Sequence, residues 1–196
     1  MRVVVSEFMA LDGVVQAPGG PEEDTSGGFA HGGWSHPYFD PEVMGPVIGA
    51  LAENCEVLLQ GATTYRVSAQ AWPERGGDPF ADWINSCQKY VVSDSLSEDE
   101  ISWRPTTIIR RADANAEVAK LREKPGGDIY VYGSLTVVRS LLAAGMVDEL
   151  LLFIEPITLG GGKRLFPDDG AARPFELMSS DTTSTGVQVC RYRPAS

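Results

Sequence analysis

VLLQGATTY, residues 57–65, is the stretch that decides the predicted fold. Its apolar run predicts a buried strand that ends at Gly61, and the residues from Thr63 onwards predict a helix. The first N–H groups of such a helix are unpaired and can bind a phosphate. A site for a phosphorylated nucleotide usually has an arginine or lysine at this bend, whereas Ala62 and Thr63 stand here. The stretch therefore indicates either a nucleotide site without its usual charge or an ordinary turn.

A second stretch of the same kind is DIYVYGS, residues 128–134, where a strand ends at Gly133 and a helix begins at Ser134. Thr64 and Ser134 add hydroxyl groups at the two helix starts. Ligands of open α/β sheets bind beyond the carboxyl ends of the strands, so two such bends in one sheet predict a dinucleotide site. For each bend taken alone, a plain turn with a helix cap stays open as the alternative. Neither bend is the GxGxxG fingerprint, so a standard Rossmann site is not expected.

The rest of the chain continues the alternation of strands and helices. Strands are predicted at about residues 2–8, 56–60, 89–93, 106–110, 128–132 and 148–155, with a hairpin at 175–192, and helices at about 41–54, 63–71, 80–86, 115–123 and 134–144. Strands alone in the last third indicate an antiparallel edge. The sequence therefore predicts a single α/β domain over residues 1–196, with a mostly parallel mixed sheet, helices on both faces and an antiparallel C-terminal edge.

Residues 9–40 form a long loop without clear periodicity, which is unusual inside a compact domain. The loop carries Phe29, Trp34, Tyr38 and both histidines, His31 and His36. A disordered linker rarely contains so many aromatic side chains, so we expect an ordered loop folded over another part of the chain. The histidines and the neighbouring acids match no ligand spacing, so no metal site is expected.

Composition and charge argue against several classes of function. The chain has 16 basic and 27 acidic residues and a formal net charge of −11, so nucleic acids and anionic membranes are not expected as partners. Glu7 and Asp12 interrupt the apolar N-terminus, so no signal peptide is predicted, and no stretch reaches the roughly 18 apolar residues of a membrane helix. Cys55, Cys87 and Cys190 lie far apart and indicate unbridged thiols in a reducing cytoplasm.

A third glycine cluster is ITLGGGKRLF, residues 157–166. Its glycines, with Lys163 and Arg164, indicate either an anion-binding nest or a flexible hairpin bend with a solvated basic pair. The cluster lacks the GK[ST] ending of a P-loop because Arg164 follows the lysine. A P-loop nucleotide hydrolase is therefore not expected.

Taken together, the motifs resemble a known family. LDGVVQAPGGPEED, LLQGATTY, KYVVS, PGGDIYVYGS and VDELLLFIEPITLGGGKRLF occur in the order found in the reductase domain of bacterial riboflavin biosynthesis, which belongs to the dihydrofolate reductase-like superfamily. The resemblance covers about residues 3–192. It implies a dihydrofolate reductase-like fold and a cytoplasmic oxidoreductase that uses NADPH, or NADH, to reduce a small heterocyclic or carbonyl substrate. It also implies a homodimer, for which DELLLFIE and the strand-rich C-terminus are the candidate interface.

The resemblance also implies roles for individual residues. Cofactor contacts are implied for Gly61 and Thr64 at the first bend, for Ser93 after the KYVV strand, and for Gly133, Ser134 and Leu135 at the second bend. Substrate contacts are implied for Leu11 and Gly13, and Asp12 is the catalytic candidate. Trp34 and Tyr65 are further candidates for the substrate wall, and a plain core position stays open as the alternative for such aromatic residues. Asp12 is expected to relay a proton or to accept a hydrogen bond, with a turn residue in the Asp-Gly pair as the alternative.

The chain departs from the family pattern where the 2′-phosphate of NADPH would bind. The family's cations are replaced by Ala62, Thr63 and Asp94. A charge-assisted hydrogen bond contributes about 1.5–3 kcal/mol, so this loss should weaken phosphate binding. Three interpretations stay open: arginines elsewhere supply the charge, NADH is the cofactor, or the pocket has drifted to another ligand. The missing cations also favour the alternative to a reductase, a non-catalytic nucleotide- or small-molecule-binding module. The candidate arginines for binding the cofactor are Arg66, Arg110 and Arg111.

Overall fold

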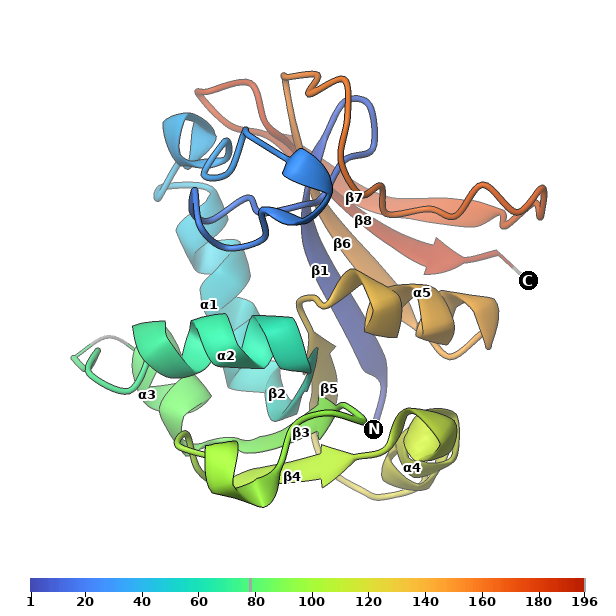
Figure 1. The fold of residues 1–196 in the computed structure, drawn as a ribbon. Helices are drawn as coiled ribbons and strands as arrows, with labels where there is room; N and C mark the ends of the chain where they lie inside the picture. Colours follow the sequence, from blue (N-terminus) through green and yellow to red (C-terminus); the bar gives the residue numbers. More distant parts are fainter. Residues whose placement is uncertain (78, 196) are drawn as a thin grey trace. The chain divides into compact units, whose positions relative to one another are not determined.

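The structure is a computed structural model that describes residues 1–77 and 79–195. Its 8 strands follow the order β4-β3-β2-β5-β1-β6-β8-β7, in a mostly parallel sheet with an antiparallel edge (Figure 1). The chain divides into two compact units, the first made of Met1–Val5 and Val47–Val147 and the second of Ser6–Pro46 and Asp148–Ser196. The first unit carries both glycine bends, and the second carries the long loop.

The first unit is a parallel α/β layer. Its strands are β2 (Cys55–Gly61), β3 (Gln88–Val92), β4 (Thr106–Ile109), β5 (Asp128–Val131) and the start of β1 (Val3–Ala10), and its helices are most of α1 (Met44–Asn54), α2 (Ala62–Ala71), α3 (Pro79–Ser86), α4 (Ala114–Arg122) and α5 (Leu135–Ala143). The pairs β1–β5, β5–β2, β2–β3 and β3–β4 are all parallel. Parallel neighbours need a crossover connection. Helices α2 and α3 lie between β2 and β3, whereas β3 and β4 are joined by residues 93–105, which contain a short 3₁₀ helix, Glu98–Glu100. The predicted alternation of strands and helices is confirmed.

Helices cover both faces of this layer, as the sequence predicted. Successive side chains of a strand point to opposite faces. Leu59 lies on the same face as α5, because it lines one pocket together with Val137 of that helix. Leu58 is paired with Tyr130, and the Tyr130 ring lies 5.8 Å from the ring of Trp83 on α3. The strands are therefore buried on both sides, which explains why their sequences are almost continuously apolar.

The second unit contains the antiparallel edge. β6 (Glu149–Glu155) pairs with β8 (Gln188–Pro194), and β8 pairs with β7 (Phe175–Thr182). The predicted C-terminal hairpin is confirmed. β6 is apolar and buried, whereas nearly all of β7 is exposed, including Leu177 and Met178 at 56% each. The apolar strand that the sequence offered as a dimer interface therefore lies inside its own unit.

The long loop is ordered, as predicted, because its aromatic residues build a small core. Phe29 and Trp34 pack with Ala10, Val14 and Ala17. The Trp34 Nε1–H donates to the Gln16 carbonyl at 2.8 Å. These contacts fold the loop over residues of its own unit.

The helix predicted to begin at Pro41 starts at Met44 instead. Residues 41–43 form a turn, and the Met44 N–H donates to the Asp40 carbonyl at 2.8 Å. One Asp40 carboxylate oxygen accepts the N–H of Glu42 at 3.0 Å, and the other accepts the N–H and hydroxyl of Ser184. Asp40 therefore stabilises a turn in front of α1 rather than the first turn of the helix itself.

The three cysteines are buried, and none forms a disulfide within the described residues. In residues 1–77 and 79–195, no helix combines the length and the apolar composition that crossing a membrane requires.

Candidate cofactor-binding site

The two glycine bends lie side by side in the first unit, because β2 and β5 are parallel neighbours. The hydroxyls of Thr64 and Ser134 share a hydrogen bond of 3.1 Å. A Cβ atom on Gly61 would lie 2.2 Å from Ser134 Oγ, and one on Gly133 would lie 2.7 Å from Thr64 Oγ1. Gly133 also has a φ of +63°, where a side chain is strained. Glycine is therefore required at both bends so that α2 and α5 can begin in contact.

Both helix starts leave backbone N–H groups without a side-chain cap. Gly61 is the N-cap of α2 and Ser134 is the N-cap of α5, and neither makes a capping hydrogen bond with a described side chain. The Ser134 carbonyl accepts the N–H of Val137 at 2.9 Å, so the first turn of α5 is well formed. The N–H groups of a first helical turn carry partial positive charge and bind phosphates. The paired starts of α2 and α5 can therefore bind a pyrophosphate.

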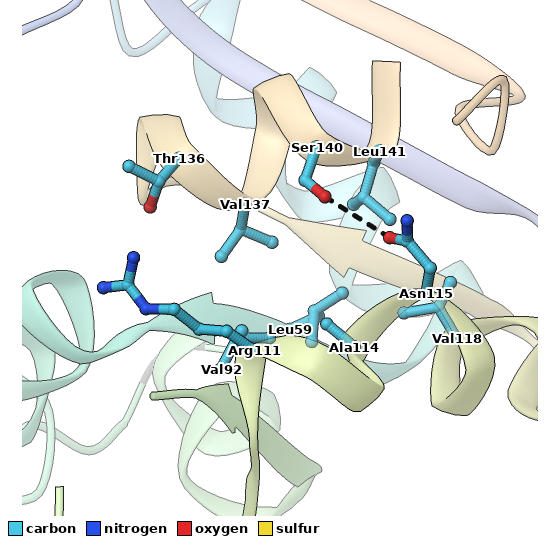
Figure 2. Close-up of a pocket in the computed structure, with 10 residues that line it drawn as sticks. All are labelled: Leu59, Val92, Arg111, Ala114, Asn115, Val118, Thr136, Val137, Ser140 and Leu141. Carbon is cyan, nitrogen blue, oxygen red and sulfur yellow. Dashed lines mark hydrogen bonds between the residues drawn. The ribbon is translucent and has the colours of Figure 1, made fainter. Parts of the chain in front are cut away.

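A pocket of about 190 Å³ lies beside the start of α5 (Figure 2). It is lined by the strand residues Leu59 and Val92, by Arg111, Ala114, Asn115 and Val118 at or before α4, and by Thr136, Val137, Ser140 and Leu141 of α5. Figure 2 shows Arg111 and Thr136 at one end of the pocket and the Asn115–Ser140 pair, joined by a hydrogen bond of 3.3 Å, at the other. A largely apolar space with a few polar groups at its ends suits a flat aromatic ring that carries a charged substituent.

The three candidate arginines have different surroundings. Arg110 donates to the carbonyls of Asp94 and Ser93 at 3.0 and 3.4 Å, so it holds the turn after β3. Arg66 is paired with Glu100 at 3.0 Å. Arg111 lines the pocket, and its Nε lies 3.6 Å from a carboxylate oxygen of Asp94. Among the lining residues, Arg111 is therefore the group that can meet an anion.

Ser93, predicted to line the adenosine side of the cofactor, is 1% exposed. Its Oγ accepts the N–H groups of Ser95 and Leu96 at 3.1 and 3.0 Å. This hydroxyl therefore stabilises the turn that follows β3. The same turn presents Asp94 next to Arg111.

In the second unit, Asp12 fastens the N-terminal turn to the third glycine cluster. One carboxylate oxygen of Asp12 accepts the N–H groups of Leu159 and Gly160 at 3.1 and 2.8 Å. Burial raises the pKa of Asp12, but the hydrogen bonds from Gly160 and Leu159 outweigh it, so the pKa is lowered. The other oxygen is buried without a partner among the described residues. Asp12 is thus an ionised acceptor at neutral pH, which suits hydrogen bonding better than proton donation.

The basic pair of the third glycine cluster is bound within the second unit. Lys163 Nζ lies 2.6 Å from a carboxylate oxygen of Asp24, and its N–H donates to the side chain of Gln16 at 3.0 Å. Arg164 Nε donates to the Asp12 carbonyl at 3.0 Å. The cluster is therefore held to the long loop, and its charges are neither flexible nor fully solvated.

The predicted substrate residues fall into buried and exposed groups. Tyr65 belongs to the first unit, is 1% exposed, and accepts the N–H of Trp103 on its hydroxyl at 3.1 Å. Trp34 belongs to the core of the second unit. In the same unit, Leu11 is 62% exposed, and Gly13 has a φ of +80° in the turn. Leu11 is thus the one of these four with a largely accessible side chain.

Two buried polar residues were missed by the sequence reasoning. Glu155, at the end of β6, is fully buried, and Ser35 donates to its Oε1 at 2.5 Å while its Oε2 has no described partner. Burial raises the pKa of Glu155 to about 7, and the Ser35 hydrogen bond lowers it only in part. Gln60, just before the first bend, is fully buried with neither amide atom bonded among the described residues. The available signal was a polar residue at the end of an otherwise apolar strand.

The fold and the paired bends define an α/β protein of the dihydrofolate reductase type. Sequence comparison makes the assignment more specific: the model of the RibD C-terminal domain family matches residues 1–189. The chain belongs to this family, as the motifs indicated.

Known proteins show the same likeness. The uncharacterized protein YyaP of Bacillus subtilis is 26% identical over 193 residues, which cover 95% of this chain and 91% of that protein. A solved structure from Shewanella sp. PV-4, whose name assigns it provisionally to riboflavin biosynthesis, has a TM-score of 0.76 at 19% identity, with both chains fully covered. Dihydrofolate reductase of Enterococcus faecalis, solved in complex with NADP(H), has a TM-score of 0.60 at 14% identity and covers 100% of this chain and 97% of that one. The last two likenesses confirm the fold.

Proposed function

We propose that the protein is an NAD(P)H-dependent reductase that transfers a hydride to a small heterocyclic or carbonyl substrate. The observation that carries this proposal is the contact between the Gly61 and Gly133 bends, with Thr64 Oγ1 3.1 Å from Ser134 Oγ, beside an apolar pocket. Two uncapped helix starts in contact match the two phosphates of a dinucleotide better than they match a single phosphate. Membership of the RibD C-terminal domain family supports the same class of activity.

The residues of the first unit fit such a cofactor. The N–H groups at the starts of α2 and α5, including that of Leu135, would hold the pyrophosphate, and the hydroxyls of Thr64 and Ser134 would add donors to it. The pocket between α4 and α5 would take the adenine ring against Leu59 and Val137. The bound nicotinamide supplies the hydride, so the task of the protein is to position the reactants and exclude water.

For the substrate side we propose the turn formed by Leu11, Asp12 and Gly13. The exposed side chain of Leu11 would contact the ligand. Asp12 would fix this turn by accepting the N–H groups of Leu159 and Gly160, because its remaining oxygen is buried. Trp34, a candidate for the substrate wall, would support this turn from the core that it forms with Ala10 and Val14. Tyr65 is buried in the first unit and would support the start of α2.

The alternative function, a non-catalytic nucleotide- or small-molecule-binding module, is favoured by the uncharged Ala62 and Thr63 and the acidic Asp94, at positions where the resemblance implies cations. Titration of the purified protein with NADPH and with NADH, followed by nicotinamide fluorescence, separates the two. Micromolar binding of either cofactor supports the reductase. Absence of binding of both at millimolar concentration would overturn it and favour the module.

We also propose that the protein forms a homodimer through the exposed strand β7. Among the described strands, β7 lies at the edge of the sheet and pairs with β8 alone. A partner strand or sheet would cover this edge and the exposed side chains of Leu177 and Met178. Light scattering coupled to size exclusion should give twice the mass of the 21.1 kDa chain for the wild type and for Val67→Asp, which alters an exposed apolar residue elsewhere. The double variant L177D/M178D should be a monomer, and a monomeric wild type would refute this proposal.

A further inference from the structure

The pocket beside α5 has one charged lining residue, Arg111. Figure 2 shows its guanidinium at the same end as Thr136, in the first turn of α5, whereas the apolar lining continues toward Asn115 and Ser140. If the pyrophosphate binds at the start of α5, the ribose that joins it to the adenine lies at the Arg111 end. This step rests on the proposed function. The 2′ position of that ribose, which carries a phosphate in NADPH and a hydroxyl in NADH, is then next to Arg111.

Arg111 does not face this position alone, because Asp94 binds it twice. One carboxylate oxygen of Asp94 accepts the backbone N–H of Arg111 at 3.0 Å, and the other lies 3.6 Å from its side-chain Nε. The turn that carries Asp94 is fixed by Arg110 and by the buried hydroxyl of Ser93. The carboxylate therefore has a defined place beside the arginine.

Among the residues that line the pocket, Arg111 is the one cation that can meet a 2′-phosphate. Ala62 and Thr63 at the start of α2 are uncharged. Arg66 is paired with Glu100, and Arg110 is bonded to main-chain carbonyls. The charge that a 2′-phosphate meets is therefore the sum of one arginine and one carboxylate.

We propose that the Asp94–Arg111 pair selects the cofactor and favours NADH over NADPH. A 2′-hydroxyl can donate a hydrogen bond to the Asp94 carboxylate, as acids do in dinucleotide sites that accept NAD. A 2′-phosphate is repelled by the same carboxylate and must draw Arg111 away from it. The side chains of Arg111 and Asp94 are 62% and 60% exposed, so the pair is weak and Arg111 is easily released once Asp94 is neutralised.

The variant that tests this selection is Asp94→Asn. An asparagine keeps an oxygen that can accept the Arg111 N–H, so the turn should persist while the negative charge is removed. The ratio of the NADH and NADPH dissociation constants, from nicotinamide fluorescence, should shift toward NADPH by about 10-fold or more, since one charge-assisted contact is gained and one repulsion is lost. Arg111→Met should weaken NADPH binding by about 10-fold and NADH binding by much less.

The matched control is Glu100→Gln. Glu100 also accepts a backbone N–H, from Ser97, and also pairs with an arginine, but its partner Arg66 does not line the pocket, whereas Arg111, the partner of Asp94, does. E100Q removes the same charge and should leave the ratio within about 2-fold. Calorimetry with adenosine 2′-phosphate and with adenosine should show the same shift in D94N without any nicotinamide, which assigns the effect to this pocket.

The outcomes separate this inference from the proposed function. If the wild type binds a cofactor but D94N and R111M both leave the ratio unchanged, the selector is refuted and the reductase stands. If the wild type prefers NADPH by more than about 10-fold, the direction of the selection is wrong and the inference also fails. If the wild type binds neither cofactor, both the reductase and the selector are overturned.

Discussion

The two units use their polar residues in opposite ways. In the second unit the charged residues around the long loop bind one another or the backbone, as Asp12 does with Gly160 and Lys163 does with Asp24. In the first unit the starts of α2 and α5 lack side-chain caps, and Arg111 lines an open pocket. Polar groups that are satisfied inside a fold stabilise it, whereas groups without internal partners are available to a ligand. Judged by charge alone, the glycine cluster with Lys163 and Arg164 would be the better candidate for binding an anion. The difference between the two units favours the uncharged bends at Gly61 and Gly133 instead.

The largest expected effect comes from Gly133→Ala, which adds a Cβ atom 2.7 Å from Thr64 Oγ1 at a φ of +63°. Strain and overpacking together should lower the free energy of unfolding by about 2–4 kcal/mol. The helix starts would also separate, so cofactor affinity should fall by about 100-fold or more. Urea unfolding and fluorescence titration measure the two effects.

The control for this variant is Gly145→Ala. Gly145 has a nearly identical φ of +64°, but a Cβ atom there would meet nothing within 4 Å. G145A should therefore cost about 1 kcal/mol of stability and leave cofactor affinity unchanged. If G133A and G145A behave alike, the close approach of the two bends has no functional meaning.

The bends could be predicted because their signals are local. An apolar run predicts a strand, a glycine ends it, and the following residues predict a helix, all within about ten residues. A parallel sheet then puts both bends at the same edge, but only the structure shows that β2 and β5 are neighbours. The difference between Arg110 and Arg111 could not be predicted, because adjacent residues differ only in the direction of their side chains. One bonds to main-chain carbonyls and the other lines the pocket.

Contacts between distant residues were also beyond the sequence. Glu155 is buried against Ser35, which lies 120 residues earlier in the chain. The apolar strand around Glu155 was recognised, but nothing in the strand itself shows whether its last residue meets solvent or the loop. The same limit applies to Asp12, whose two backbone donors are 147 and 148 residues away.

The second prediction concerns the pH dependence of stability in the second unit. Burial raises the pKa of Glu155 from the ordinary 4.5 to about 7, so between these values the folded chain keeps a proton that the unfolded chain has lost. The contribution of Glu155 is therefore fully present below about pH 4.5 and is lost as the pH rises through 7. The loss of this contribution should lower the free energy of unfolding by about 3 kcal/mol between about pH 4.5 and 7.

Glu155→Gln isolates this contribution, because it keeps an oxygen that accepts the Ser35 hydroxyl but does not titrate. In urea unfolding, the free energy of unfolding of the wild type should fall between about pH 4.5 and 8. This fall should be smaller by about 3 kcal/mol in E155Q. Other titrating groups, such as Glu23, whose pKa is also raised, chiefly by burial, contribute equally to both proteins and cancel in the difference. Parallel pH profiles for the two proteins would show that Glu155 is ionised at neutral pH despite its burial.

The smallest effect is expected at Gln60, the one residue of β2 whose side-chain amide is fully buried without a described partner. Replacing a buried, unsatisfied polar group by an apolar one of similar shape removes a desolvation cost, so Gln60→Met should raise the free energy of unfolding by about 1–2 kcal/mol. Gln88→Met is the control, because Gln88 Nε2 donates to the Lys89 carbonyl and to Thr107 Oγ1 at 2.9 and 3.2 Å. Q88M should lower stability by up to about 1 kcal/mol, so the two glutamines should respond with opposite signs. A loss of stability in Q60M would mean that Gln60 has a partner after all, such as a bound water.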